Sequence, residues 1–353
     1  MTYIYRSEEA DPFLRGKQFG AVHAKQIART VQGYGAMFDE LAGHAYDTTA
    51  DGAAALTATQ QFAPHLHAEM LGLAEGSGLP PEAIGAINAR TEVIARIGAK
   101  TRGECSAVIA LPPGDLPPVA VQTWDWFYRF AGTWLVWEIP LPDGTMTRTM
   151  TEYGIVGKSG LNTRGIGVLF TILHHTADGD GIGLPVHVAA RAALDLGQDI
   201  NNAAQILASA PVTASSSINL VSYEDGTAAA LSVEMHPGGP SFVLPDAGLL
   251  VHTNHFLAPE PALHDTEPRG FPDTLIRRDL LQRRLAGGAR TVDQVLAAMS
   301  SHMGSGAAVC CHHDPAGNPA VQYETLATVT LDLVHGQIAV HAGGPCTARC
   351  SAA

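Results

Sequence analysis

The sequence predicts an α+β protein in which layers of helices cover stacked antiparallel sheets. Three observations support this prediction: a mostly helical first hundred residues, paired strands in the middle of the chain, and helix pairs between the later strands. Hairpins that alternate with helix pairs are typical of layered folds. With 353 residues, 46% of them hydrophobic, the chain can bury a large core. We find no repeat and no Ser- or Gly-rich linker, and therefore predict a single domain over residues 1–353.

Three stretches near the start of the chain have the apolar periodicity of helices: residues 20–41, 62–74 and 82–97. The third follows two prolines, which suit the first turn of a helix. Arg90 and Glu92 lie two residues apart on it, so their side chains do not face each other. We expect them to brace this helix rather than to take part in chemistry.

After residue 105 the sequence pattern changes from helical periodicity to that of strands. A strand is predicted at residues 119–124, and two hairpins pair residues 133–141 with 144–153 and 155–161 with 166–173. The elements that follow are predicted helices at 185–196 and 201–208, strands at 217–223, 228–234 and 249–252, helices at 272–285 and 291–299, and strands at 327–333 and 337–342.

The charge and hydropathy of the chain exclude two classes of partner. A net charge of −13 disfavours nucleic acid, because phosphates would be repelled. No apolar run is long enough to span a bilayer, and the first fifteen residues contain no apolar segment of the secretory type. We therefore expect a cytoplasmic protein with no nucleic-acid or membrane partner.

The five cysteines do not indicate a disulfide framework, since their number is odd. The run Cys310-Cys311-His312-His313 suggests zinc, but adjacent ligands cannot easily share one tetrahedral site and the usual spacers are missing. Buried residues at a strand end are the favoured interpretation. His174 and His175 are discounted for a similar reason, because neighbouring strand residues point to opposite faces. We predict no metal and no cofactor.

Cys105 is the most informative residue of the chain. A helical segment leads to a short glycine-containing break, Cys105 follows it, and an apolar strand-like run begins at once. A chain could cut itself at such a position. Cys105 would then be a new N-terminus that carries a thiol and an α-amine, which together supply a nucleophile and its base.

Three further segments place polar residues beside predicted strands. Asp125 lies among aromatic residues at a strand end, Asn162 lies in a glycine-rich turn, and Asn254 ends an apolar strand. Each residue also has an ordinary structural interpretation. Taken singly, that interpretation is favoured for Asn162, and the other two stay open.

Taken together and in order, these segments resemble the isopenicillin N acyltransferase (acyl-coenzyme A:6-aminopenicillanic acid acyltransferase) family of cysteine N-terminal-nucleophile (Ntn) hydrolases. The resemblance runs nearly from end to end of the chain. The matching positions are Gly16, Gly20 and His23, residues 88–92 and 103–106, Trp124 and Asp125, residues 157–167 and 183–185, His187, Arg191, and residues 252–255.

The resemblance implies a four-layer αββα sandwich of two antiparallel sheets between helical layers. It implies self-cleavage between Glu104 and Cys105, with an α chain of residues 1–104 and a β chain of residues 105–353 that stay associated. Cys105 would be the nucleophile and, once cleaved, supply the α-amine base. Asp125 would orient the nucleophile, and Asn254 would form the oxyanion hole.

The substrate pocket is expected to include Trp124, Trp126, Thr171 and His175. Thr171 stands where the relatives often carry an asparagine. Before the Thr-Leu of a late strand, where they tend to carry an arginine, this chain has Gln322-Tyr323-Glu324. An arginine there could bind a substrate carboxylate, so its absence disfavours a penicillin-like carboxylated substrate.

Three functions remain open. The first is hydrolysis of an amide bond in a small N-acyl compound or peptide through an acyl-Cys105 thioester. The second is acyl transfer from a thioester or amide donor to an amine. The third is a non-catalytic binding module on the same fold. We favour hydrolysis, because water is always available, and the retention of Cys105, Asp125 and Asn254 disfavours the third.

Overall fold

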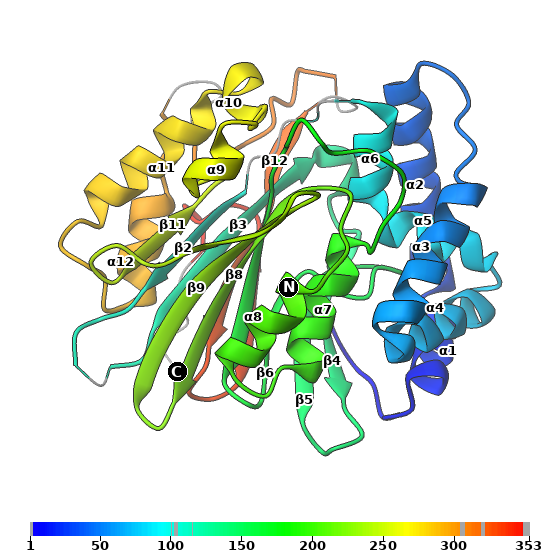
Figure 1. Ribbon diagram of the computed structural model, residues 1–353, viewed down its shortest axis with the longest axis horizontal. Coiled ribbons are helices and arrows are strands. Elements are labelled where there is room, and N and C mark those ends of the chain that lie inside the picture. The colour runs from blue at the N-terminus through cyan, green and yellow to red at the C-terminus, as the bar shows by residue number, and fades with distance from the viewer. Residues whose placement is uncertain are drawn as a thin grey trace.

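Two β-sheets lie face to face in the computed structural model, which describes residues 3–99, 101, 105–114, 116–303, 308–318 and 322–348 (Figure 1). The larger sheet has eight strands in the spatial order β1 (Ile4–Arg6), β4 (Trp134–Pro140), β5 (Met146–Glu152), β6 (Ser159–Asn162), β7 (Ile166–Ile172), β8 (Ser216–Glu224), β9 (Thr227–His236) and β10 (Gly239–Val243). The smaller sheet has five, in the order β11 (Leu249–His252), β2 (Ser106–Ala110), β3 (Val119–Phe127), β12 (Tyr323–Asp332) and β13 (Gln337–Ala342).

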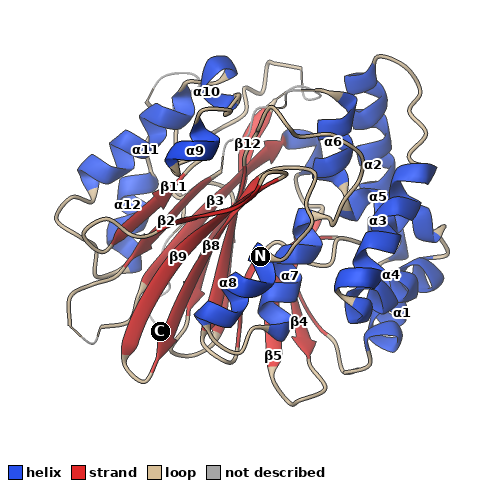
Figure 2. Ribbon diagram, viewed as in Figure 1, coloured by secondary structure: helices blue, strands red, loops and turns tan. Residues whose placement is uncertain are grey.

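Helices cover the outer faces of both sheets, as Figure 2 shows. The helices α7 (Val186–Leu196) and α8 (Ile200–Ala208) pack on the eight-stranded sheet, and α11 (Asp273–Arg284) and α12 (Val292–Met299) pack on the five-stranded sheet. Side chains alternate along β2: Ala107 and Ile109 join the core between the sheets, whereas Val108 and Ala110 pack under α11 and α12. The predicted αββα sandwich is thus confirmed.

One strand departs from the predicted antiparallel pattern. The short strand β1 pairs with β4 in parallel, because it reaches the sheet from the N-terminus rather than through a hairpin. All other described strand pairs are antiparallel. The predicted strand at 155–161 begins only at Ser159, since a turn closed by the Ile155 N–H on the carbonyl of Glu152 comes first.

The N-terminal helices form a group beside the sandwich (Figure 1). They are α1 (Pro12–Val22), α2 (Ala24–Ala42), α3 (Thr49–Phe62), α4 (Pro64–Ser77), α5 (Pro81–Asn88) and α6 (Arg90–Ile97). The predicted helix 82–97 is therefore two helices that meet at Ala89. The helix α3 was not predicted, because it packs on α5 through glycines rather than through a large apolar stripe. A Cβ on Gly52 would lie 1.9 Å from the carbonyl oxygen of Glu82.

The remaining described elements are short: a 3-10 turn (Tyr128–Phe130), α9 (Pro259–Ala262) and α10 (Glu267–Gly270). None of the described helices combines the length and the apolarity that crossing a membrane requires.

Candidate active site

The strand register brings the three predicted catalytic residues to one end of the five-stranded sheet. Ser106 of β2 pairs with Thr123 of β3, and Ala107 pairs with His252 of β11. Extending both registers toward the start of β2 places Cys105 between the segment of β3 that holds Asp125 and the residues that follow β11. Cys105 thus lies opposite Trp124, the residue before Asp125, and opposite Asn254, so three neighbouring segments bring the predicted catalytic residues to one end of the sheet.

Cys105 is buried, with a relative exposure of 3%. Burial raises the pKa of its thiol to about 11, and the negative charge of Asp125 adds to this shift. Lys158, a backbone hydrogen bond with Asp125, and Arg277 act in the opposite direction but do not outweigh it. The thiol is therefore protonated at neutral pH. Glu104, the predicted partner of the scissile bond, lies outside the described residues.

Asp125 lies within β3 and is fully buried. Its backbone is held on the far side by Thr325 of β12, with which it is paired in the sheet. Its negative charge contributes to the raised pKa of the Cys105 thiol, and its backbone hydrogen bond acts in the opposite direction. The strand fixes the backbone of Asp125 next to Trp124, the residue of β3 that lies opposite Cys105.

Arg277 of α11 links Cys105 to Asn254 and was not predicted. Its Nη1 donates to the carbonyl oxygen of Cys105 at 2.9 Å and to Oγ of Ser106 at 3.0 Å. Its Nη2 donates to Oδ1 of Asn254 at 3.0 Å, and Asp273 accepts from its Nε at 3.1 Å. In the sequence, Arg277 stands in a basic helix with an (i, i+4) acidic partner, a pattern typical of solvated helix surfaces. No local sequence pattern indicated that the side chain of Arg277 is buried.

Arg277 also fixes the orientation of the Asn254 amide. A guanidinium only donates hydrogen bonds, so the atom of Asn254 that faces Arg277 must be the oxygen. The Nδ2 group then points the other way and donates one N–H to the carbonyl of Ile172 at 3.0 Å. The backbone N–H of Asn254 donates to Oγ1 of Thr274 at 2.9 Å. Asn254 is fully buried, and within the described part of the chain no hydrogen bond is made by the second N–H of its Nδ2.

Lys158, Glu152 and Arg90 form a buried group, here called the site cluster, that adjoins Cys105. Lys158 Nζ donates to Glu152 at 2.9 Å and lies 3.7 Å from the ring centre of Trp124. The Arg90 guanidinium lies 3.3 Å from Glu152 and 4.6 Å from the ring centre of Trp126. Both tryptophans predicted for the pocket thus have a cation over the ring.

Burial lowers the pKa of Lys158 to about 7, although Glu152 opposes the shift. The three nitrogens of Arg90 donate no hydrogen bond to the described residues. Glu92 does not join this cluster: its Oε1 accepts from the backbone N–H of Val186 at 2.8 Å, at the start of α7. Burial raises the pKa of Glu92 to about 8. The expectation that Arg90 and Glu92 do not face each other is confirmed.

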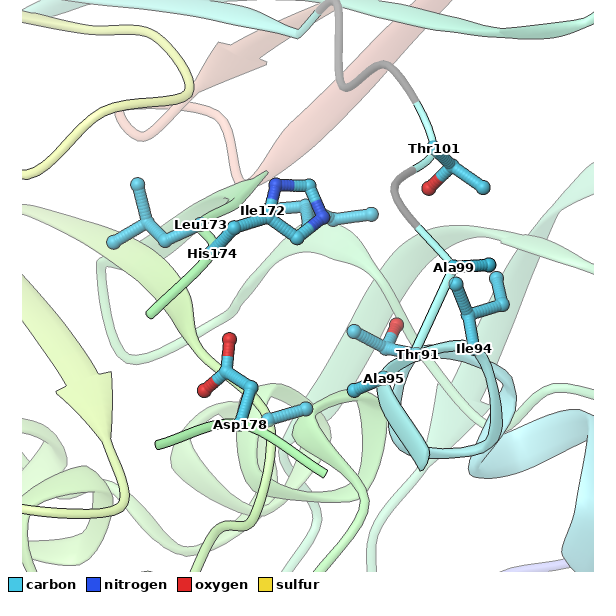
Figure 3. Close-up of a pocket in the computed structure, with 10 residues that line it drawn as sticks. Thr91, Ile94, Ala95, Ala99, Thr101, Ile172, Leu173, His174 and Asp178 are labelled. Atoms are coloured by element: carbon cyan, nitrogen blue, oxygen red, sulfur yellow. The ribbon is translucent and has the colours of Figure 1, made fainter. Parts of the chain in front are cut away.

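A narrow cavity of about 20 Å³ lies beside the site, between α6 and the end of β7. Figure 3 shows Thr91 and Ile94 on one side and His174 and Asp178 on the other. This volume holds one or two waters and no substrate. The cavity is close to Asn254, because Ile172, whose carbonyl accepts a hydrogen bond from Nδ2 of Asn254, lines it.

The four predicted pocket residues do not line this cavity. Besides the two tryptophans, Thr171 lies in β7 with Oγ1 at 3.2 Å from Nδ1 of His252. The ring of His175 lies farther along the chain, 5.0 Å from that of His236 and 5.4 Å from that of His264. Thr171 is therefore near Asn254 through His252, whereas His175 belongs to a group of histidines.

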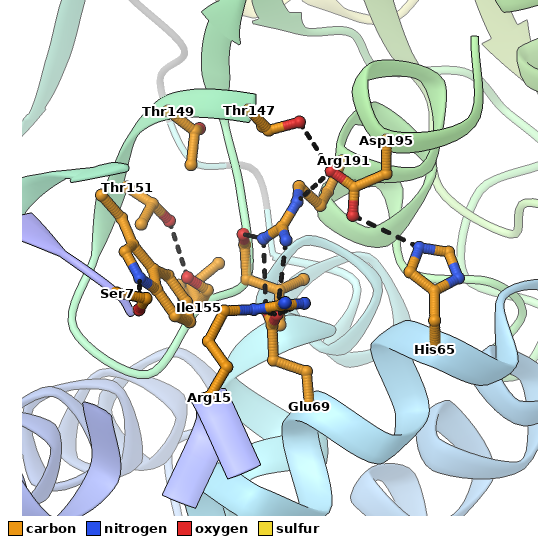
Figure 4. A network of polar contacts seen from close by, with 12 residues as sticks. Ser7, Arg15, His65, Glu69, Thr147, Thr149, Thr151, Ile155, Arg191 and Asp195 are labelled. Atoms are coloured by element: carbon orange, nitrogen blue, oxygen red, sulfur yellow. Dashed lines mark hydrogen bonds and ion pairs between the residues drawn. The ribbon is translucent and has the colours of Figure 1, made fainter. Parts of the chain in front are cut away.

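A second buried charge group, here called the balanced network, joins the N-terminal helices to α7 (Figure 4). Arg15 of α1 donates to Glu69 of α4 at 2.6 Å, and Arg191 of α7 donates to the other oxygen of Glu69 at 3.1 Å. Arg191 also donates to Asp195 at 2.7 Å, and Thr147 of β5 donates to the same carboxylate at 2.8 Å. Two cations and two carboxylates thus balance in charge.

Comparisons with known proteins agree with the motifs. The family model described as acyl-coenzyme A:6-aminopenicillanic acid acyl-transferase matches residues 118–268. A protein of Emericella nidulans, the 40 kDa form of acyl-coenzyme A:6-aminopenicillanic-acid-acyltransferase, is 28% identical over 229 residues. That alignment covers 64% of this chain, and the chain spans only 60% of the relative's length.

Two solved structures also match parts of the chain. One is the N-acylethanolamine-hydrolyzing acid amidase ortholog of Caenorhabditis elegans, with a TM-score of 0.44, 12% identity, and coverage of 64% of this chain and 92% of that chain. The other is penicillin V acylase from Agrobacterium tumefaciens, with a TM-score of 0.45, 13% identity, and coverage of 67% and 83%. The family model and the curated relative thus confirm the resemblance seen in the motifs: residues 118–268 match the acyl-coenzyme A:6-aminopenicillanic acid acyl-transferase family.

Proposed function

We propose that this protein is a self-processing cysteine Ntn enzyme that hydrolyses an amide bond of a small N-acyl compound or peptide. The observation that carries the proposal is the bridge made by Arg277, which binds the carbonyl of Cys105 and the side chain of Asn254 at once. Asp125 acts on the pKa of the same thiol, and all three residues are buried. We therefore assign the roles of nucleophile, orienting acid and oxyanion donor to Cys105, Asp125 and Asn254.

Processing begins with attack of the Cys105 sulfur on the carbonyl carbon of Glu104. The bond from that carbon to the nitrogen of Cys105 breaks, and a thioester forms. The sulfur loses a proton and the departing amine gains one, so the step is neutral overall. Water then hydrolyses the thioester, which leaves the α chain of residues 1–104 and the β chain of residues 105–353.

Catalysis uses the amine that processing exposes. An α-amine has a pKa of about 7.7–8.0, so much of it is neutral near pH 7 and can take the thiol proton. The thiolate attacks the substrate amide, and the second N–H of Asn254 stabilises the oxyanion. The leaving amine takes the proton, and water releases the acid from the acyl-Cys105 thioester. Asp125 holds the α-amine and the thiol in place.

Acyl transfer to an amine is the second candidate function. It is supported by the names of the matching family and of the Emericella nidulans relative. Both reactions share the acyl-Cys105 thioester and differ in the acceptor, which is water or an amine. The acyl donor for transfer could be an amide or an acyl thioester.

We expect the two chains to stay associated after the cut, in the cytoplasm. Contacts between them are buried: Asn88 Nδ2 donates to the carbonyl of Gly154 at 2.9 Å, and Asn88 Oδ1 accepts from the N–H of Val156 at 2.9 Å. The contact between Glu92 and Val186 is of the same kind. None of these bonds depends on the link between residues 104 and 105.

Denaturing mass spectrometry of the purified protein tests processing. We expect fragments of residues 1–104 and 105–353 from the wild type and from Cys311→Ala, a control that removes another buried thiol. Cys105→Ala should stay whole. A wild type that stays whole under all conditions would contradict self-processing.

The acceptor is tested by incubating the processed enzyme with N-acyl amines and acyl thioesters, with and without added amine. Trapping of the acyl group on Cys105 identifies the donor, and the ratio of free acid to new amide separates hydrolysis from transfer. If no donor acylates Cys105 while an electrophile still labels it, the proposed substrate class is wrong.

A further inference from the structure

Four side chains with metal-binding atoms converge outside the candidate active site. His302, Cys310, His312 and Cys346 each offer one such atom, and these atoms lie within 4.8 Å of one another. His302 follows α12, Cys310 and His312 precede β12, and Cys346 follows β13. We propose that this Cys2His2 cluster binds one zinc ion that ties the three segments together.

The distances between the ligand atoms fit a tetrahedral zinc site. Nε2 of His302 and Nε2 of His312 are 3.1 Å apart, and the latter lies 3.5 Å from Sγ of Cys310 and 3.4 Å from Sγ of Cys346. Zinc bonds of about 2.0–2.1 Å to nitrogen and 2.3 Å to sulfur, at tetrahedral angles, separate ligand atoms by about 3.4–3.8 Å. These three separations lie within a few tenths of an ångström of the tetrahedral values, and no other pair of the four ligand atoms is more than 4.8 Å apart.

The donor set selects the metal. Two thiolates and two imidazoles suit zinc and do not suit magnesium or calcium, which prefer oxygen ligands. Binding displaces the protons of both thiols, and the two thiolates then neutralise the charge of the ion. Because four protein ligands fill a tetrahedron, no position is left for substrate, and the role is structural.

The backbone already holds the cluster together. The N–H of Cys310 donates to the carbonyl of Ser301 at 3.0 Å, next to His302. The N–H of Gly343 donates to the carbonyl of Leu326 at 3.1 Å, which fixes the segment that leads to Cys346. A Cβ at Gly344 would lie 2.4 Å from Sγ of Cys310, so only glycine leaves room for this sulfur. The site therefore requires no large rearrangement.

The fold answers the objection that adjacent residues cannot share a metal. Only alternate members of the run 310–313 face the cluster. Sγ of Cys311 lies 3.4 Å from the carbonyl of Ala308, and the ring of His313 stacks on Tyr128 at 3.9 Å. Of the other two ligands, His302 lies 10 residues before His312 and Cys346 lies 34 residues after it, so the spacing does not match a known zinc pattern.

The proposed ion would also support the strand that carries Asp125. Between two of its ligands, Cys311 exchanges hydrogen bonds with Thr325: its N–H donates to Oγ1 at 2.9 Å, and its carbonyl accepts from the Thr325 N–H at 3.1 Å. Thr325 is paired with Asp125 across β12 and β3. The metal site thus anchors the outer neighbour of the catalytic strand.

The main competitor of a metal is a disulfide between Cys310 and Cys346. To distinguish the two, the full chain is produced with zinc in the medium and purified without chelator. Elemental mass spectrometry then measures the zinc content, and mass spectrometry of the alkylated protein measures the number of free thiols. We expect about one zinc per chain. Alkylation of Cys346, which is exposed, should be about tenfold or more slower before chelation than after it. This measurement needs no variant.

Matched variants locate the ion. Cys346→Ser and His312→Gln should lose most of the zinc, whereas Cys311→Ser and His313→Gln should keep it. Cobalt(II) in place of zinc should show the absorption of a tetrahedral thiolate site, and Cys346→Ser should weaken its charge-transfer band. Three results would each overturn the proposal. The wild type could remain free of zinc after zinc loading, or Cys346→Ser and His312→Gln could both keep a full zinc content. Freshly purified protein could also contain a Cys310–Cys346 disulfide.

Discussion

The balanced network and the site cluster are both buried, but they differ in how their charges are paired. In the balanced network, two guanidinium groups share two carboxylates through hydrogen bonds of 2.6–3.1 Å. The site cluster has two cations for one carboxylate, Glu152, and Arg90 donates no hydrogen bond to the described residues. The first arrangement satisfies its charges. The second has a positive excess, although burial lowers the pKa of Lys158 to about 7, so this cation is only partly charged at neutral pH.

This difference suggests a structural role for the balanced network and a chemical role for the site cluster. A buried network whose members are all paired fixes the elements that it joins, and removing one member is costly. A buried positive excess next to a thiol favours the thiolate, and Lys158 indeed lowers the pKa of Cys105. The four expectations below, from the largest effect to the smallest, test whether the two clusters have these separate roles.

Glu69→Ala should have the largest effect, because it leaves Arg15 and Arg191 buried without their shared carboxylate. We expect the free energy of unfolding in urea to fall by about 3–5 kcal/mol. Glu75→Ala is the control: Glu75 pairs with Lys17 at 2.6 Å, but both are half-exposed, so a loss below about 1 kcal/mol is expected. Equal losses in both variants would show that the balanced network has no special structural role.

Asn254→Ala should slow acylation of Cys105 by about 10²–10³, the usual effect of removing one oxyanion donor. The rate of acyl-enzyme formation measures this, and circular dichroism confirms that the variant is folded. Asn162→Ala serves as a control, since Nδ2 of Asn162 donates to the carbonyl of Leu194, away from the site. A folded Asn254→Ala enzyme with the wild-type rate would remove Asn254 from the mechanism.

Raising the pH should speed self-processing by about tenfold per unit between pH 7 and 9, because the thiolate fraction rises until the pH reaches the thiol pKa of about 11. The balanced network should not respond in this range. Burial opposes ionisation of Asp195, but Arg191 and His65 hold its pKa well below the ordinary value.

The stability that Asp195 contributes is therefore fully present above its unfolded-state pKa of about 4 and is lost as the pH falls through the folded-state value. The rate at which the uncut chain disappears at pH 7, 8 and 9 checks the prediction on self-processing. Urea unfolding of Cys105→Ala at the same three pH values checks that the stability from the balanced network does not change. A flat processing profile would show that thiolate formation does not limit the cut.

Lys158→Met should have the smallest effect. Without this cation the thiol pKa of Cys105 rises, and processing at pH 7 should slow by about threefold to tenfold. Densitometry of whole chain against time gives the rate, with Lys17→Met as a surface control. Faster processing in Lys158→Met would mean that the positive excess hinders the thiol rather than assisting it.

The sequence was sufficient for elements whose burial pattern is local. The hairpin of β4 and β5 and the helices α7 and α8 lie close to their predicted positions, because periodicity and turn residues specify them. It was insufficient for α3, whose contact with α5 depends on close backbone approach at a glycine in each helix, Gly52 and Gly85. Cys105, Asp125 and Asn254 could be chosen from motifs. Arg277 could not, because its burial results from packing between α11 and β2, which no local pattern encodes.

The balanced network has a kinetic consequence, because it crosses the proposed cut. Arg15 and Glu69 precede residue 104, whereas Arg191 and Asp195 follow it. An uncut chain folds in a unimolecular reaction that brings these charges together. A processed protein, once unfolded, would have to find its partner in solution, so its refolding would depend on concentration. The molecule would therefore have to complete its fold before it makes the cut. After the cut, a protein that unfolds could no longer return to the native state by a unimolecular reaction.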